Sequence, residues 1–376
     1  MFAFESATVK QKDKDGTILF LWRKSMIQKI TVGADIGCNH AKLYAGNGRK
    51  ISIRSTVSTK PQVGISLGGA TKGPDEIVIQ VGNSVYAVGP RVESPLDTRF
   101  GSYYSSDMNA ALVLAILVQE FGDLSNAEVD AVFGMPLNVF YNYRGEVNSD
   151  LIKARVKAWR QPASVLSGGR AGLQLPRGGS VFANLNGTAE GVAVYLDYMM
   201  DEEGMFQVEP EGLDVVVDIG GNTTDLALFE NGVLVFGGNS DSFEVGALHL
   251  YERVASTVKD RMGLMRTPPL YAVEHAIREN GSRLKIGNSE ENIRDIVAIE
   301  TRAIVNEIVP RVEKIVSRRR DELRRVLFAG GTTEMLRDDL KGVEIGRAQS
   351  IVVDDPQYAN AKGNYKLARH LAATQE

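Results

Sequence analysis

The chain has 376 residues, of which 43% are hydrophobic and 24% are charged, and its formal net charge is -4. This balance excludes a protein that binds nucleic acid through a strongly basic surface. The single cysteine, Cys38, excludes an internal disulfide framework and a multi-cysteine metal site. Because the length exceeds what one core normally supports, we expect a cytoplasmic protein of two domains or of one duplicated architecture.

The N-terminal extension, residues 1–25, contains a charged run and one short apolar stretch, TILFLW. This stretch is too short to span a membrane, and no small-residue cleavage site follows it. A second methionine, Met26, stands directly before the first convincing strand. We therefore expect a disordered or loosely packed extension without membrane contact, and the sequence leaves Met1 or Met26 open as the native start.

Short apolar runs predict β-strands in the first part of the chain after this extension. The Gly-rich segment 63–73 is expected to be a loop between hairpins. Residues 107–121 are apolar nearly all round, which predicts a helix buried between two layers, with Asp107 as its N-cap. Another helix is predicted from about Thr188. The expected strands are 30–37, 41–46, 50–55, 76–82, 84–89 and 130–137.

The second part of the chain repeats this plan with a strand, a Gly-containing loop and a strand over 214–236. A strand is predicted at 325–331, and Pro310 is expected to kink the longest helix. The expected helices are 245–262, 270–280, 290–325 and 364–373. Because each half carries a strand-loop-strand unit with an Asp-x-Gly sequence, we expect a duplicated α/β architecture.

The two Asp-x-Gly loops read DIGCNHAK over 35–42 and DIGGNTTD over 218–225. Each places a carboxylate at a strand end, followed by a glycine that allows backbone N–H groups to approach an anion. An aspartate beside a polyphosphate repels it unless a divalent cation intervenes, so Asp35 and Asp218 predict Mg²⁺ held mainly through waters. Lys42 would supply positive charge. One such loop can simply turn a hairpin, whereas two copies favour a ligand.

A third loop follows the predicted strand near the C-terminus, in VLFAGGTTEML over 326–336. Gly330 and Gly331 leave room for a purine ring or a ribose phosphate against the backbone, and a helix N-terminus follows. The alternative interpretation is a close strand-to-helix turn.

The three motifs, in this order, resemble those of the actin-like ATPase superfamily: 35–42 is similar to its phosphate 1 motif, 218–225 to phosphate 2 and 328–335 to the adenosine motif. Segments 131–142 and 354–366 are similar to parts of the plasmid-segregation ParM/StbA group. The resemblance implies a duplicated, ribonuclease H-like α/β fold with two lobes around a nucleotide cleft. Lobe I would comprise 26–185 with 347–376 returning to it, and lobe II would comprise 186–346.

The resemblance also implies that ATP or ADP binds with Mg²⁺, whose hydration shell Asp35 and Asp218 position. The binding residues would be Gly37, Cys38, Asn39, Lys42, Gly220, Gly221, Asn222, Thr223, Thr224, Gly246, Gly330, Gly331 and Thr332. Cys38 departs from the pattern, because relatives place a hydroxyl or amide donor there and a thiol donates weakly. Either its backbone N–H matters, or hydrolysis is slow, or the cysteine is structural.

Hydrolysis requires a water aligned behind the γ-phosphate, and Asp218 is one expected catalytic residue. The other is Glu190, because AEGVAVY over 189–195 resembles the helix start PEGVGAYY of the group. An acidic residue at the start of a helix is also a common surface feature, so this alternative stays open.

The function implied is an ATPase that polymerises with ATP bound, hydrolyses it in the filament and drives plasmid partition through a DNA-bound adaptor, without touching DNA itself. A small-molecule kinase of the same superfold is the alternative, and no P-loop motif is present. The basic cluster 317–325 either contacts DNA or is a solvated helix face beside Asp321 and Glu322. The sequence does not decide between ATP and GTP.

Overall fold

A computed structural model of the chain describes residues 8–12, 18–22, 27–61, 76–90, 92, 94–142, 144–168, 171–235 and 241–374. The predicted loop 63–73 and most of the N-terminal extension lie outside these residues. Within the extension, β1 (Thr8–Lys12) pairs antiparallel with β2 (Ile18–Trp22) in a separate two-stranded sheet. No helix of the described part of the chain is long and apolar enough to cross a membrane.

The first large sheet has five strands in the order β11-β9-β3-β4-β5. β3 pairs in parallel with β9, and β9 with β11, so these three strands end at the same edge of the sheet. The β3–β4 and β4–β5 pairs are antiparallel. The strands are β3 (Gln28–Ile36), β4 (His40–Tyr44), β5 (Lys50–Arg54), β9 (Ala127–Met135) and β11 (Phe182–Ala189).

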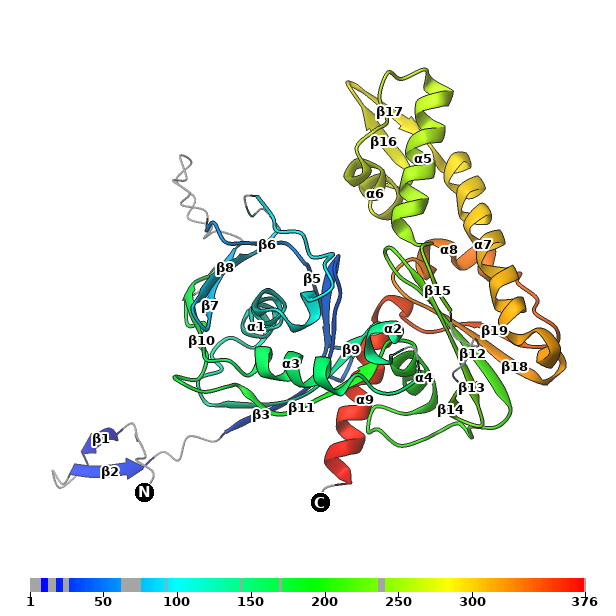
Figure 1. The fold of residues 1–376 in the computed structure, drawn as a ribbon. Coiled ribbons are helices and arrows are strands. Elements are labelled where there is room, and N and C mark those ends of the chain that lie inside the picture. The colour runs from blue at the N-terminus through cyan, green and yellow to red at the C-terminus, as the bar shows by residue number, and fades with distance from the viewer. Residues whose placement is uncertain are drawn as a thin grey trace.

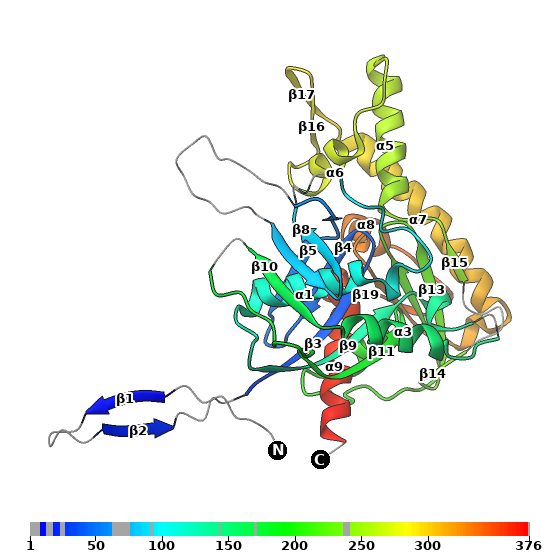
Figure 2. The ribbon, with the colours of Figure 1, turned by 60° about the vertical axis from the view of Figure 1, so that its left-hand side comes forward.

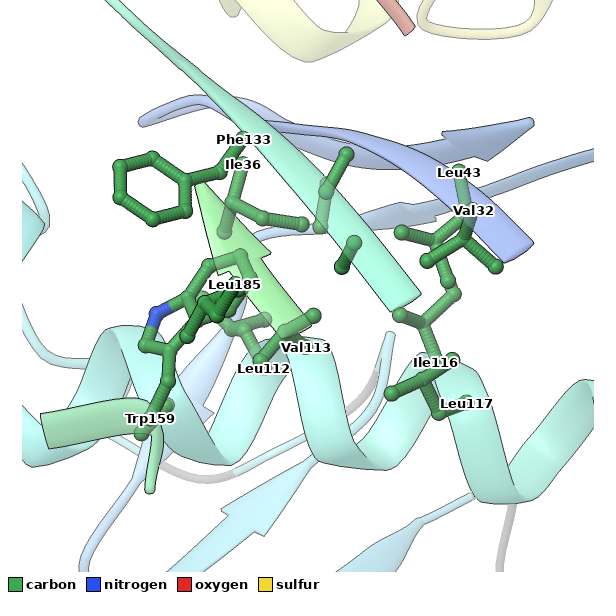
Figure 3. Packing of buried hydrophobic residues seen from close by; sticks show 14 of the residues in the cluster. Val32, Ile36, Leu43, Leu112, Val113, Ile116, Leu117, Phe133, Trp159 and Leu185 are labelled. Atoms are coloured by element: carbon green, nitrogen blue, oxygen red, sulfur yellow. The ribbon is translucent and has the colours of Figure 1, made fainter. Parts of the chain in front are cut away.

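Helix α1 (Asp107–Phe121) packs between this sheet and a four-stranded sheet, as Figure 1 shows. Its side chains Leu112 and Ile116 are fully buried and lie in one cluster with Val32 and Leu43 (Figure 3). The prediction of a helix buried between two layers is confirmed. The N-cap is Ser106 rather than the predicted Asp107, because the Ser106 side chain accepts a hydrogen bond from the backbone N–H of Asn109. The four strands are β10 (Ala163–Ser167), β7 (Ile77–Val81), β8 (Ser84–Val88) and β6 (Val57–Ser58).

The second large sheet is built around β12 (Leu213–Ile219), which pairs antiparallel with β13 (Thr224–Glu230) and parallel with β18 (Leu323–Ala329). Apolar side chains on one of its faces form a separate buried cluster with helices of this part of the chain, whereas Val216, Phe229 and Leu327 belong to the cluster of the first sheet. The sheet also contains β14 (Val233–Leu234), β15 (Asp241–Phe243) and β19 (Gln349–Val352). Its helices are α5 (Ala247–Met262), α6 (Leu270–Arg278), α7 (Arg294–Val316), η2 (Ser317–Glu322) and α8 (Thr333–Leu340).

A small hairpin, β16 (Arg283–Ile286) with β17 (Ser289–Asn292), lies with α5 and α6 beyond the edge of the second sheet (Figures 1 and 2). The predicted helix 290–325 is shorter at both ends, because β17 precedes it and η2 follows it. Four-residue strands with charged sequences carry almost no periodic signal, which is why the pattern did not reveal this hairpin.

Helix α9 (Ala359–Ala373) packs against β3, β9 and α4 (Val192–Met199). A Cβ atom on Gly33 of β3 would lie 1.9 Å from the Ala361 carbonyl oxygen, and one on Gly363 would lie 1.7 Å from the Ala193 carbonyl oxygen. The backbone of α9 is therefore in direct contact with both neighbours, which only glycine allows. The remaining helices are η1 (Tyr103–Ser105), α2 (Leu137–Phe140), α3 (Ser149–Trp159) and η3 (Pro356–Tyr358).

The predicted helix start at Thr188 is wrong, because β11 runs to Ala189 and α4 begins only at Val192. Parallel pairing with β9 outweighs the local helical pattern here.

The boundaries predicted for the two lobes do not coincide with the boundaries of the two large sheets. β11 extends the first sheet beyond residue 185, and β19 still belongs to the second sheet, so the return to the first sheet starts after it.

Candidate functional site

Three carboxylates lie where strands of the two large sheets end. Asp35 is on β3 and Asp218 is on β12, while Glu190 directly follows β11. All three line a single cleft of about 1470 Å³, whose walls come from both sheets and from α6 and α8. The prediction that two similar hairpins face a shared cleft therefore agrees with the structure.

The hairpin of β3 and β4 places Lys42 directly opposite Asp35 in the strand register. The Lys42 ammonium donates to Asp35 Oδ2 at 3.0 Å. Burial disfavours the charged ammonium, yet the adjacent Asp35 outweighs this and raises the pKa of Lys42. The loop between the strands closes with Gly37 N donating to His40 O at 3.1 Å. This hairpin therefore brings a carboxylate and its own counter-charge to the cleft.

The hairpin of β12 and β13 places Asp225 opposite Asp218. Asn360 Nδ2 donates to Asp218 Oδ2 at 2.6 Å. Burial raises the pKa of Asp218 to about 7, with Asp225 and Asp35 adding to the increase against the opposing effects of the Asn360 hydrogen bond and Lys42. A carboxylate with such neighbours is a site where an added cation is strongly stabilising.

The two hairpin loops approach each other closely. A Cβ atom on Gly221 would lie 2.3 Å from Asn39 Nδ2, so the Asn39 side chain rests directly against the backbone of the second loop. The backbone N–H groups of Cys38, Asn39, Gly221 and Asn222 donate to no other residue that the structure describes. Unpaired N–H groups in two facing loops, beside carboxylates and one ammonium, fit a polyphosphate with a divalent cation.

The third loop packs against the second. Gly330 has a φ of +96°, and a Cβ atom there would lie 2.5 Å from Asp218 Oδ1. The hydroxyl of Thr332 donates to the Gly220 carbonyl oxygen at 2.6 Å. Gly330, Gly331 and Thr332 all line the cleft, as the sequence motif led us to expect.

Two of the predicted binding residues, Thr224 and Gly246, are not among those that line the cleft. Thr224 is fully buried, and its hydroxyl donates to the Val245 carbonyl oxygen at 2.7 Å. A Cβ atom on Gly246 would lie 2.6 Å from the Gly220 carbonyl oxygen. Both residues therefore support the second loop from behind, and the geometry gives them no direct place at a ligand.

Cys38 lines the cleft, and its thiol is held by residues that also line it. Its Sγ donates to the Thr98 carbonyl oxygen at 3.2 Å, and Thr98 Oγ1 donates to the Cys38 carbonyl oxygen at 2.7 Å. Burial is the main cause that raises the pKa of the thiol. These contacts favour the structural interpretation of the side chain and leave the Cys38 backbone N–H as the group available to an anion.

Glu190 stands in the turn between β11 and α4, where Gly191 adopts a φ of +79°. Its backbone N–H donates to the Met135 carbonyl oxygen at 2.7 Å. Burial raises the pKa of the Glu190 carboxyl well above its usual range, with Asp35 and Asp218 adding to the effect. Glu190 is therefore a strand-end carboxylate inside the cleft, and the alternative of a helix-start surface acid is not supported.

Sequence reasoning missed two asparagines of α9. Asn360 bonds Asp218 and accepts from Gly191 N at 3.2 Å, while Asn364 Nδ2 donates to the Ala34 carbonyl oxygen at 2.8 Å. Their spacing of four residues on a helix places both on one face. That spacing was readable in ANAKGN, but nothing in the sequence indicated which strand ends the face would meet.

The basic cluster 317–325 forms ion pairs within the molecule. Its described arginine side chains pair with Glu230 and Glu322 (Arg319), Glu313 (Arg320), Glu211 (Arg324) and Asp214 (Arg325). Such pairing argues against a DNA contact. The helix-face interpretation fits only residues 317–322, because Arg324 and Arg325 lie on β18 and Arg325 is buried.

Comparison with known protein families finds two matches. Residues 33–158 match the family described as the N-terminal domain of actin-like proteins, and residues 216–342 match the C-terminal family of archaeal MreB-like actin homologues. Each match contains one of the two hairpin loops. A search of curated proteins finds no match.

Solved structures of actin homologues share the fold. The archaeal homologue Ta0583 in complex with ADP is 17% identical with a TM-score of 0.67, covering 92% of this chain and 100% of that one. A ParM from Clostridium botulinum, solved as a 15-stranded filament, is 16% identical with a TM-score of 0.66, covering 92% and 100%.

The actin-like protein Alp7A is 15% identical with a TM-score of 0.71, and the similarity covers 93% of this chain and 98% of that one. The similarity thus extends over both sheets, and the cleft lies between the two parts that the family matches identify. The chain therefore belongs to the actin-like superfamily, whose two-lobed α/β fold it shares with ParM proteins and archaeal actin homologues.

Proposed function

We propose that this protein is an ATPase that binds ATP with Mg²⁺ in the cleft and polymerises into filaments in an ATP-dependent manner. The observation that carries the proposal is the close approach of the two hairpin loops at Asn39 and Gly221, with Asp35 and Asp218 behind them. Loops of this kind hold a phosphate chain from both sides, so a single ligand would join the two lobes.

The chain's own residues suit distinct roles at such a ligand. The backbone N–H groups of the two loops would bind phosphate oxygens, and Lys42 would neutralise part of their charge. Asp35 and Asp218 would hold Mg²⁺ through its water ligands, and the bound cation would neutralise charge on the phosphates. Glu190 would orient the attacking water and accept its proton.

Relatives support the nucleotide and filament parts of the proposal. The archaeal homologue was solved with ADP, and the Clostridium ParM was solved as a filament. We extend this to a cytoplasmic role in plasmid DNA segregation, in which a DNA-bound adaptor links the filament to its cargo. The ion pairs within the basic cluster 317–325 agree with an adaptor rather than direct DNA contact.

The test combines light scattering, negative-stain microscopy and phosphate release. With ATP and Mg²⁺, we expect scattering to rise, filaments to appear and scattering to fall as ATP is consumed. With ADP, or with ATP and a chelator, we expect none of these. ATP turnover that requires an added metabolite, without filaments, would contradict the proposal and indicate a kinase instead.

A further inference from the structure

Arg155 of α3 is a buried cation that forms no ion pair with the residues that the structure describes. Its side chain is 0% exposed. No carboxylate of the described residues lies within ion-pair distance of it, and its Nε and Nη2 atoms have no hydrogen-bond partner among those residues. A buried guanidinium in this state costs several kcal/mol unless something offsets it, so its presence requires an explanation.

The contacts that Arg155 does make fix its position at the end of β9. Nη1 donates to the Gly134 carbonyl oxygen at 2.8 Å. The guanidinium lies 4.5 Å from the ring centroid of Phe133, 4.9 Å from that of Trp159 and 5.4 Å from that of Tyr104. Burial lowers the pKa of Arg155 to about 10, so the side chain stays positively charged at neutral pH. Three aromatic faces hold this charge in one orientation.

Gly134 connects Arg155 to the cleft. A Cβ atom on Gly134 would lie 3.4 Å from Glu190 Cγ, so the Glu190 side chain packs against the residue whose carbonyl Arg155 holds. Glu190 shares the cleft with Asp35, Asp218 and Asp225, all of the same charge sign. The positive charges of Arg155 and Lys42 act on the Glu190 carboxyl in the opposite direction to these repulsions.

We propose that Arg155 is a positioning residue for Glu190: it fixes the end of β9 on which the Glu190 side chain rests and supplies the positive charge that holds its carboxylate in place for the attacking water. This inference rests on the proposed ATPase function. It assigns Arg155 no contact with the nucleotide. Arg155 therefore acts on the rate of turnover and leaves nucleotide binding nearly unchanged.

The main variant is Arg155→Met, which keeps a long apolar side chain but removes the charge and the Gly134 hydrogen bond. We expect kcat to fall about 10-fold or more, because a positioned acid-base group contributes about 100-fold or more when it is fully oriented. The dissociation constant for ATP, measured with a fluorescent analogue, should change less than about threefold. Arg155→Lys, which retains the charge, should recover part of kcat.

A double-mutant cycle separates positioning from general loosening of the core. If Arg155 acts through Glu190, Arg155→Met should have almost no further effect in a Glu190→Gln background. Phe182→Leu is the matched control, since Phe182 packs on Trp159 in the same aromatic group and the change keeps Arg155 and the three rings around it. Its kcat should stay within about threefold of the wild type. Thermal unfolding of each nucleotide-free variant establishes that it is folded.

Two outcomes would overturn the assignment: wild-type kcat in a folded Arg155→Met variant, or an equal further loss in the Glu190→Gln background. If Arg155→Met does not fold, Arg155→Lys takes its place in the test. A folded Arg155→Lys variant whose kcat is no higher than that of Glu190→Gln would also overturn the assignment. Absence of ATP turnover by the wild type is a different result, because it would refute the proposed function together with this inference.

Discussion

The two hairpins that face the cleft have the same backbone and different charges. In β3–β4 the residue opposite Asp35 is Lys42, whereas in β12–β13 the residue opposite Asp218 is Asp225. The first hairpin therefore carries its own counter-charge at 3.0 Å. The second has two carboxylates, and the neutral amide of Asn360 is the hydrogen-bond donor to Asp218.

This difference indicates that the duplicated architecture divides its electrostatic tasks between the halves. The first hairpin is close to neutral, because the Lys42 ammonium offsets the charge of Asp35, so it repels an anion less. The second hairpin is suited to bind an anion only together with a cation, because its pair of carboxylates otherwise repels it. Four experiments test this division, in order of decreasing expected effect.

Removing the carboxylate of the second hairpin should have the largest effect. We expect Asp218→Ala to abolish ATP-dependent assembly and to weaken Mg²⁺-dependent ATP binding by about 100-fold, since metal ligands and their partners contribute at this scale. Light scattering and nucleotide titration measure the two effects. Glu230→Gln, at the far end of β13, is the matched control. Normal assembly by Asp218→Ala would refute the role of the second hairpin.

Removing the ammonium of the first hairpin should have the next largest effect. Lys42→Ala leaves Asp35 without its ion-pair partner and the anion without a nearby positive charge. We expect ATP affinity to fall about 10-fold or more, with a greater dependence on Mg²⁺. Lys50→Ala on β5, whose ion pair with Asp355 lies at the surface, should bind ATP as the wild type does. Equal affinities for the two variants would contradict the division.

The second hairpin should make the stability of the fold depend on pH, through Asp218. The folded-state pKa of Asp218, about 7, exceeds its ordinary value of 3.8. Asp218 therefore contributes stability that is complete below pH 3.8 and is lost as the pH rises through about 7. Without Mg²⁺, we expect Asp218→Asn to melt several degrees above the wild type near pH 8, a gap on the order of a few kcal/mol.

That gap should narrow as the pH falls toward about 5, because wild-type Asp218 becomes protonated and neutral. Mg²⁺ should raise the melting temperature of the wild type and leave Asp218→Asn almost unchanged. Scanning calorimetry at several pH values measures both trends. A gap that is constant with pH would show that Asp218 is ionised throughout.

The smallest effect concerns an ion pair across the cleft. Arg54 of β5 bonds Glu274 of α6 at 2.7 Å, and both residues line the cleft. If both hairpins hold one ligand, Arg54→Glu should speed ADP release about two- to fivefold, the scale of an exposed pair. The double variant Arg54→Glu with Glu274→Arg, which exchanges the two charges, should restore the wild-type rate of ADP release. Arg49→Glu, whose partner Glu120 lies in the same lobe, should not change it.

The sequence was sufficient to predict the two hairpin loops because their signals are local. A buried strand, an aspartate and a glycine recur in each half, which indicates a duplicated α/β architecture, and the resemblance to actin-like ATPases added the shared cleft. The sequence also predicted Glu190 as a site residue, although it placed it on a helix instead of after β11. The strand pairing that decides this is not local and leaves no periodic trace.

The rest of the site depends on contacts between distant residues. Asn360 reaches Asp218 from α9, 142 residues along the chain, and both Arg155 and Glu190 contact Gly134. A lone asparagine or arginine in a helix has many ordinary explanations, so its residue type alone indicates nothing. Which strand end it reaches is determined by the packing of whole elements, as the backbone contacts at Gly33 and Gly363 illustrate.

Helix α9 has a mechanical consequence. One asparagine of this helix bonds the carboxylate that ends β12, and another, one turn later, bonds a carbonyl near the end of β3. The backbone of α9 is in direct contact with β3 at Gly33, so the helix has almost no room to move relative to that strand. We therefore expect any hinge motion between the lobes to turn about this helix. A bulky substitution at Gly363 would collide with the Ala193 carbonyl oxygen, so we expect it to impair that motion without touching the cleft.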